Sequence, residues 1–318
     1  MQIIVFGMHR SGTSPLTRII NLMGAYVGPE GTLMGPTKDN PKGYWEREDV
    51  HTLHRKILHA GGAAWDRVSK FDLSASSPEQ RSAFAEKLRE IVLNLEAHRP
   101  WVLKDPRMCV LFPLWRNLLE VPVCVLIYRS PLQVAESLKT RNGFSLQFGI
   151  ALWEQYNLAA LANTQGFPRL LVSHSQLMEQ PIEAVRALYE GLVSLGVQGL
   201  RCPGEKEIRA FIDPALYRER GDAKLAREFL NHAQMELLQA FADQRVLGFE
   251  SIPPLSAGAL EAIAEYEIAE EKGRTLRLAE TERRAKEAEA AKLRQQVAEA
   301  ERRLAREQEE RQRFEREA

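Results

Sequence analysis

The residues best suited to chemistry stand near the N-terminus, in the run GMHRSGTS over residues 7–14. Gly7 and Gly12 have the spacing of a phosphate-binding loop, but Thr13 stands where the lysine of a nucleoside-triphosphate loop is expected. The glycines let successive backbone N–H groups point into one cavity at a helix N-terminus, where the helix dipole favours an anion. Arg10 adds a planar cation that can bind two oxygens of one phosphate or sulfate. The loop therefore predicts an anion site.

A second basic group follows in the run IYRSPLQVAESLKTR, over residues 127–141. Arg129 ends an apolar run at a place where a nucleotide triphosphatase would have an acidic residue to hold Mg²⁺. Pro131 is suited to the first turn of a helix, and the four-residue step then places Ser137 and Arg141 on one helix face. These residues predict a second phosphate pocket that binds its anion directly, without metal.

Charged residues in two other segments have competing interpretations. Lys104 directly follows an apolar run in WVLKDPR, where a cation would stabilise negative charge during group transfer. The alternative is an ion pair between Lys104 and Asp105 at a strand end. His51 and His54 are three residues apart, but no third ligand accompanies them. A polar helix face is therefore favoured over a metal site.

Apolar runs alternate with helical patterns along the first 200 residues. This alternation predicts an α/β fold with a parallel sheet flanked by helices, joined by right-handed crossovers. Ligands of such sheets bind beyond the carboxyl ends of the strands, which is where the charged residues stand. The predicted strands cover residues 2–6, 101–103, 121–128 and 170–173, and the predicted helices cover about 15–23, 46–59, 78–97, 131–140, 145–164 and 182–195.

The composition sets limits on the class of protein. With 318 residues, 44% of them hydrophobic, the chain is long enough for a substantial core. A net charge of +0 gives no overall attraction to nucleic acid or to an acidic membrane, so nucleic acid is not an expected partner. Three widely spaced cysteines indicate a reducing compartment. Since no apolar stretch reaches the length of a membrane span, we expect a cytoplasmic protein without a transmembrane segment.

The composition changes after about residue 254, where Ala, Glu, Arg and Lys become dominant. We expect one domain over residues 1–254 and a long charged helix over 255–318. Ala290, Leu293 and Val297 follow the spacing of a coiled-coil seam, but charged residues interrupt the seam further on. A weak coiled coil and a solitary helix satisfy this composition equally well. The coiled coil would serve a homodimer or a partner helix, and the pattern is also compatible with a fragment of a longer protein.

The two basic motifs together resemble the signature segments of sulfotransferases that use 3′-phosphoadenosine 5′-phosphosulfate (PAPS). The similarity covers roughly residues 1–250 and looks most like bacterial members. It implies a P-loop-like α/β fold, no metal, and transfer of a sulfuryl group to a hydroxyl, with a glycan or another cell-surface or secondary metabolite favoured as acceptor. By this resemblance the 5′ side of the donor is bound by Arg10, Ser11, Gly12, Thr13 and Ser14, and the 3′-phosphate by Arg129, Ser137 and Arg141.

The resemblance also implies catalytic roles. Lys104 stands in a Lys-Asp-Pro element whose lysine contacts the sulfuryl group in related enzymes, and Arg10 is expected to assist it. The segment NPKGYWE, over residues 40–46, is similar to a stretch whose glutamate makes Glu46 the expected general base, with His51 or His54 in reserve. One departure stands at His174, where many members have a tyrosine near the adenine.

Two other functions remain open on the sequence alone. A P-loop kinase of a small metabolite would need ATP and Mg²⁺, and the chain lacks the loop lysine on which such enzymes depend. A non-catalytic scaffold would use a decayed enzyme domain to display the C-terminal helix. The intact anion-binding residues favour the enzyme.

Overall fold

A computed structural model of the chain describes residues 1–37, 40–212 and 228–317. Within these ranges it describes the side chains of all residues except 278, 300, 301 and 303–317. Its contacts divide the chain into two units, Met1–Ile263 and Ala264–Ala318. The first unit contains a four-stranded sheet in the order β2-β1-β3-β4, and all neighbouring strands are parallel. The predicted α/β class is therefore confirmed. The strands are β1 Gln2–Phe6, β2 Trp101–Lys104, β3 Pro122–Tyr128 and β4 Arg169–Ser173.

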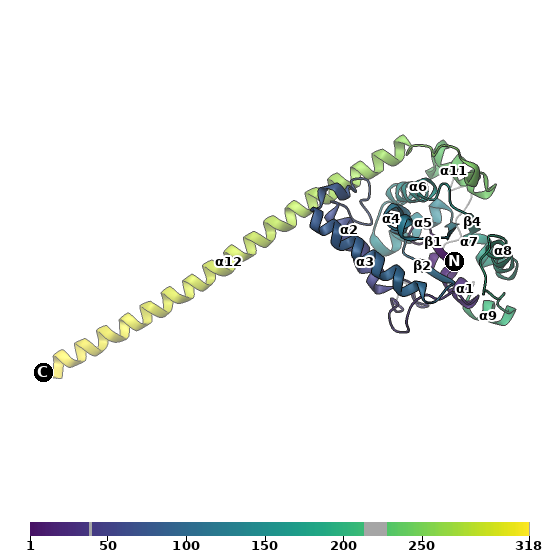
Figure 1. Ribbon diagram of the computed structural model, residues 1–318. Helices are drawn as coiled ribbons and strands as arrows, with labels where there is room; N and C mark the ends of the chain where they lie inside the picture. The colour runs from purple at the N-terminus through teal and green to yellow at the C-terminus, as the bar shows by residue number, and fades with distance from the viewer. Residues whose placement is uncertain (38–39, 213–227, 318) are drawn as a thin grey trace. The chain divides into compact units, whose positions relative to one another are not determined.

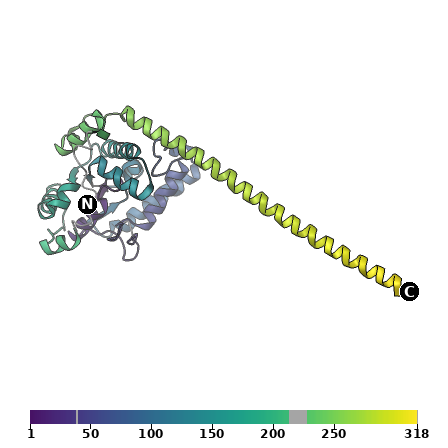
Figure 2. The same ribbon diagram turned by 180° about the vertical axis from the view of Figure 1, so that it is seen from behind.

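Helices cover both faces of this sheet (Figure 1). Helices α7 (His174–Glu179) and α8 (Pro181–Ser194) lie on one side of the strands, and α4 (Met108–Trp115) and α6 (Leu146–Asn163) lie on the other. The view from behind shows the N-terminus lying among the helices of the first unit (Figure 2). Alternate residues of each strand face opposite sides. Ile3 and Val5 join a buried cluster with the apolar residues of α1 and α8. Phe6 packs edge-on against Phe112 of α4 on the other face, with the ring centroids 5.0 Å apart. Burial on both faces explains why the strands are continuous apolar runs.

The six predicted helices correspond to α1, α2, α3, α5, α6 and α8, and their ends agree within two residues. Short 3₁₀ segments lie at Leu73–Ala75, Arg116–Leu118 and Arg245–Gly248. The helices are α1 Thr13–Leu22, α2 Glu48–Ala60, α3 Pro78–Glu96, α4 Met108–Trp115, α5 Pro131–Asn142, α6 Leu146–Asn163, α7 His174–Glu179, α8 Pro181–Ser194, α9 Glu205–Phe211 and α11 His232–Ala242.

Helices α4, α7, α9 and α11 have no counterpart among the predicted helices. The sequence of α4, MCVLFPLW, is apolar throughout and contains Pro113, so it shows no helical periodicity. The start of α2 was predicted two residues too early. Glu46 and Arg47 instead lie in an extended segment, where the Glu46 carbonyl accepts the Met34 N–H and Arg47 forms a bridge with Leu33. Glu46 is therefore held by backbone pairing rather than by a helix.

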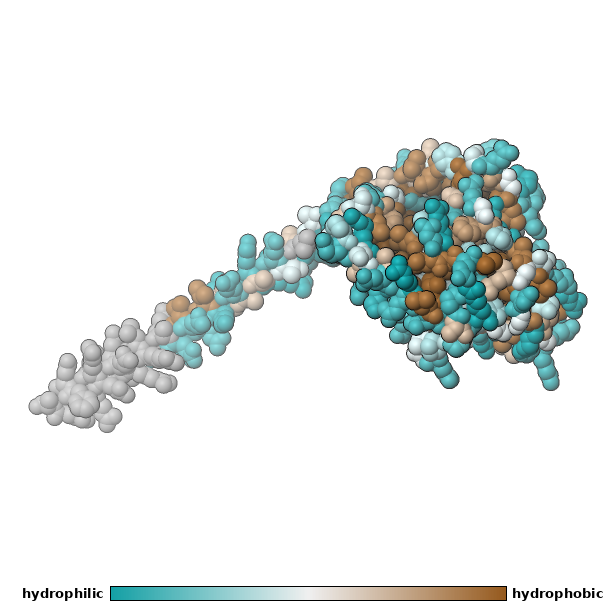
Figure 3. Space-filling model, viewed as in Figure 1, coloured by the Kyte–Doolittle hydropathy of each residue, from teal (hydrophilic) through white to brown (hydrophobic). Residues whose placement is uncertain are grey.

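The long helix α12, Ala257–Glu317, begins in the first unit and accounts for the described part of the second. Ala259, Ala262 and Ile263 of its first turns are buried. Beyond Ile263 the described surface is mostly hydrophilic (Figure 3). Two apolar side chains of the predicted seam, Leu293 and Val297, are more than half exposed on it. No described helix is both long enough and apolar enough to cross a membrane.

Candidate active site

A pocket of about 250 Å³ lies beyond the carboxyl ends of the strands. The segments that follow β1, β3 and β4 contribute Arg10, Arg129 and His174 to its lining, and Lys104 ends β2 behind it. Parallel strands end at one edge of a sheet, so residues distant in the sequence converge there. The other lining residues are His9, Gly12, Thr13, Ser14, Pro15, Asn40, Pro41, Lys42, Gly43, Tyr44, Glu46, Pro106, Ser137, Thr140, Arg141, Met178, Phe211 and Ile212.

The glycine loop leads directly into helix α1 with Gly12 as its N-cap. Gly12 has a φ of 90°, and Arg10 also adopts a left-handed backbone, with a φ of 69°. No side chain caps this helix, and its first turn contains no acidic residue. The N–H groups of the first turn have no partner within a helix, so those of Thr13 and Ser14 are available to an anion in the pocket.

His174 packs directly against this loop. A Cβ added to Gly12 would lie 2.3 Å from Cδ2 of His174, so the close approach requires glycine. Burial, together with the neighbouring Arg129, lowers the pKa of His174 to about 3. His174 is therefore neutral at physiological pH. It lines the pocket and also supports the loop, a contact that the sequence did not predict.

The predicted 3′-phosphate residues lie beside the loop. The Nε of Arg10 donates to the Ser137 Oγ at 2.9 Å, so residues assigned to the two ends of the donor are in direct contact. An Nη of Arg129 donates to the Arg10 carbonyl at 2.9 Å, and its Nε donates to Gln133 at 3.1 Å. The guanidinium of Arg141 lies 5.4 Å from the centre of the Trp65 ring. Among the residues predicted to bind the donor, Ser11 is the exception, because it is fully buried and does not line the pocket.

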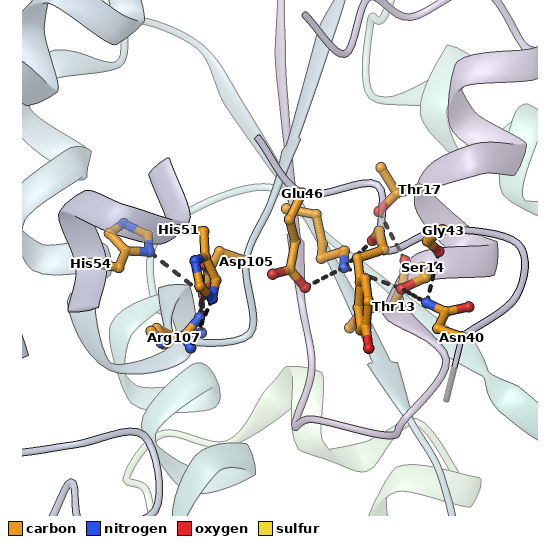
Figure 4. A network of polar contacts seen from close by, with 12 residues as sticks. Thr13, Ser14, Thr17, Asn40, Gly43, Glu46, His51, His54, Asp105 and Arg107 are labelled. Atoms are coloured by element: carbon orange, nitrogen blue, oxygen red, sulfur yellow. Dashed lines mark hydrogen bonds and ion pairs between the residues drawn. The ribbon is translucent and has the colours of Figure 1, made fainter. Parts of the chain in front are cut away.

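Lys104 and Glu46 form a buried ion pair at the floor of the site, with Nζ 2.7 Å from the Glu46 Oε1 (Figure 4). The ammonium also donates to the Tyr44 carbonyl at 2.5 Å and to the Ser14 Oγ at 3.2 Å. Burial raises the pKa of the Glu46 carboxyl, and the attraction of Lys104 only partly offsets this effect. A raised pKa makes a carboxylate a stronger base, which suits Glu46 to accept a proton.

The alternative ion pair between Lys104 and Asp105 is wrong. Both carboxylate oxygens of Asp105 accept from Arg107 at 3.1 Å, and Nδ1 of His54 lies 3.6 Å from one of them. Burial alone would raise the pKa of Asp105, but Arg107 and His54 outweigh burial and hold it well below its usual range. His54 is fully buried and accepts from the Trp115 indole, so the prediction of a polar face is wrong for His54.

The pocket is electropositive although the whole chain is neutral. Among the described lining residues, Arg10, Lys42, Arg129 and Arg141 are cations, and Glu46 is the one carboxylate. Burial, together with Arg107 and Arg141, lowers the pKa of His9 well below its usual value, so His9 adds no charge. The described residues contain no group of three or more His, Cys, Asp or Glu side chains that could hold a metal ion.

Sequence reasoning missed two polar residues of the site. Asn40 donates to the Ser14 Oγ at 3.3 Å, and Lys42 donates to the Phe211 carbonyl at 2.5 Å. Both residues stand in NPKGYWE, the same segment that contains Glu46. Two aromatic residues from this part of the chain do not line the pocket: Tyr26 pairs with Trp101 at the start of β2, and Trp45 packs against Phe211.

No protein-family model and no curated protein matches this chain. Among solved structures, the chain is similar to the "Sulfotransferase Domain from the Synechococcus PCC 7002 Olefin Synthase", with 15% identity, a TM-score of 0.39, and coverage of 84% of this chain and 94% of that one. It is also similar to "sulfotransferase STF9 from Mycobacterium avium", with 17% identity, a TM-score of 0.40, and coverage of 80% and 78%.

Proposed function

We propose that this protein is a sulfotransferase that moves a sulfuryl group from PAPS to an acceptor hydroxyl, with a glycan favoured as acceptor. One observation carries the proposal: a single pocket combines an uncapped helix N-terminus, a cluster of arginines and a buried lysine–glutamate pair. The helix N-terminus and the arginines suit an elongated ligand that has an anionic group at each end. The lysine–glutamate pair provides a base and a cation for group transfer.

The residues present fit the donor at both of its anionic ends. The Gly12 turn provides a cradle without a side chain, and the N–H groups of Thr13 and Ser14 suit the 5′-phosphosulfate. Ser137 and Arg141, with Arg129 behind the loop, suit the 3′-phosphate. When bound, PAPS would supply an activated sulfuryl group whose leaving group is adenosine 3′,5′-bisphosphate.

The protein would supply the proton acceptor and the charge stabilisation for the transfer. Glu46 would take the proton from the acceptor hydroxyl as that oxygen bonds to sulfur and the bond from sulfur to the bridging oxygen breaks. Arg10, which lines the pocket, would stabilise the charge of the transferring group directly, and Lys104 would do so through Ser14, which it contacts. The products are a sulfate ester and the bisphosphate, and the proton remains on Glu46 until solvent removes it.

The site is less suited to a kinase. A kinase that binds Mg²⁺ needs a carboxylate free to hold the metal. The one carboxylate among the described lining residues is Glu46, and it is paired with Lys104. The scaffold alternative would predict binding of the bisphosphate without transfer to any hydroxyl compound.

Titration calorimetry with adenosine 3′,5′-bisphosphate tests the proposal. We expect saturable binding in the absence of Mg²⁺, weakened tenfold or more by Arg141→Ala, since a phosphate would lose a charged donor. Lys139→Ala on the exposed side of α5 is the matched control and should bind like the wild type. Absence of binding by the folded protein, or tighter binding of MgATP, would overturn the proposal.

A further inference from the structure

Two N–H donors converge on the hydroxyl of Ser14, the second residue of helix α1. The Ser14 Oγ lies 3.2 Å from Nζ of Lys104 and 3.3 Å from Nδ2 of Asn40 (Figure 4). A hydroxyl has two lone pairs and one proton. Both contacts occupy lone pairs of the oxygen, so its proton is left to point elsewhere.

The direction of the Asn40 contact follows from a second hydrogen bond. Nδ2 of Asn40 lies 2.7 Å from the carbonyl oxygen of Gly43, which can only accept. The end of the amide that faces Gly43 and Ser14 must therefore be the NH₂ group. The backbone of Asn40 is fixed as well, because its N–H and carbonyl exchange hydrogen bonds of 3.1 Å with Thr37.

The direction of the Lys104 contact is equally determined, because an ammonium has three protons and no lone pair. The three protons match three acceptors, namely the Ser14 Oγ, the Tyr44 carbonyl and the Glu46 carboxylate. Lys104 is almost fully buried and does not line the pocket. Its charge therefore reaches the pocket through the side chains that it contacts.

We infer that Asn40 and Lys104 make the Ser14 hydroxyl an obligate donor into the pocket, and that Asn40 is a positioning residue for the anion that Ser14 binds. Ser14 lines the pocket, and its proton has no acceptor among the described residues. A hydroxyl that accepts from an ammonium is also a stronger donor, because the hydrogen bonds polarise one another. The ligand it suits is a phosphate or sulfate oxygen. This inference rests on the proposed function, since it specifies how the same pocket holds its donor.

A double-mutant cycle tests the inference, with adenosine 3′,5′-bisphosphate as the probe in titration calorimetry. We expect Ser14→Ala to raise Kd about tenfold and Asn40→Ala about three- to tenfold. The double variant should bind within about twofold of Ser14→Ala, because Asn40 acts only through the hydroxyl. A merely structural role of Asn40 would weaken binding in both backgrounds, and additive effects would overturn the inference.

Thr37→Val is the matched control for the loop. The Thr37 hydroxyl contacts the Tyr44 hydroxyl at 2.8 Å in the same loop and does not touch Ser14. We expect Thr37→Val to bind like the wild type, and a loss equal to that of Asn40→Ala would overturn the inference. All variants are also titrated with inorganic sulfate. If the wild type binds sulfate but not the bisphosphate, the proposed function fails, and the sulfate cycle alone decides the role of Asn40.

Discussion

At the scale of single residues, the site depends on buried charges that satisfy one another. Lys104 and Glu46 have side chains exposed by 1% and 8%, so removal of either would leave the other charge buried without its partner. A test of Glu46 as base therefore needs an isosteric change. Glutamine keeps an oxygen for Lys104 to donate to, but it cannot take up the proton of a hydroxyl.

Glu46→Gln should leave bisphosphate affinity within a few-fold of wild type and lower turnover about 10² to 10⁴-fold. The pH profile gives a second readout. Because burial raises the pKa of Glu46 above its ordinary value of 4.5, activity should fall as the pH drops through that raised pKa, where the carboxyl becomes protonated. The variant should lack this acidic limb. Turnover is measured with labelled donor and an acceptor found by screening hydroxyl compounds, and unchanged turnover would transfer the role of base to His51.

At the scale of elements, the loop between β1 and α1 is shaped by its contact with the start of α7. Gly12 combines a φ of 90° with the approach of the His174 ring, so any Cβ there meets both backbone strain and a clash. Gly7 is similarly enclosed, because a Cβ would lie 2.8 Å from the Ile127 side chain on β3. The conformation of the loop therefore depends on residues more than 100 positions away.

Gly12→Ala should abolish detectable bisphosphate binding and lower the free energy of unfolding by about 1–3 kcal/mol. Gly62→Ala is the matched control, since Gly62 has a φ of 72° but open space around it. The control carries the backbone strain without the clash, so it should lose some stability and keep full binding. Calorimetry and urea unfolding measure the two quantities. Equal binding by the two variants would contradict the role assigned to the contact with His174.

At the scale of the whole molecule, Glu154 connects the end of the first unit to its centre. This buried carboxylate on α6 accepts from the Ser256 N–H at 2.5 Å, from its hydroxyl at 2.8 Å and from Gln234 of α11 at 2.8 Å. Ser256 in turn accepts the N–H of Ala259 and so caps α12. The neighbouring Trp153 donates to the Arg129 carbonyl at 2.9 Å, so one turn of α6 contacts both the helix start and the pocket.

Glu154→Gln should lower the free energy of unfolding by about 1–3 kcal/mol, because an amide cannot accept from all three donors. Hydrogen exchange should be faster at residues 259–263, the first turns of α12. Glu190→Gln removes the same charge on the exposed side of α8 and should change neither quantity. A stability equal to wild type in the Glu154 variant, measured by urea unfolding, would show that the helix start is held in another way.

The sheet could be predicted from the sequence, because its strands are buried on both faces and appear as isolated apolar runs between helical segments. The sequence also indicates that Gly12, Arg10 and Arg129 stand at strand ends, where parallel topology brings them together. Helix α4 escaped prediction because a wholly apolar segment has no periodicity to read.

The pairing of the charges could not be predicted from the sequence. Lys104 has Asp105 beside it in sequence, yet it pairs with Glu46, while Asp105 pairs with Arg107. The same holds for the donors that meet at Ser14, since Asn40 and Lys104 come from different segments. Which side chains pair depends on differences of a few tenths of an ångström in the distances between their atoms. The spacing of residues along the sequence does not contain those distances. The direction in which the Ser14 hydroxyl donates therefore depends on the packing of the loop, β2 and the segment before α2 against one another.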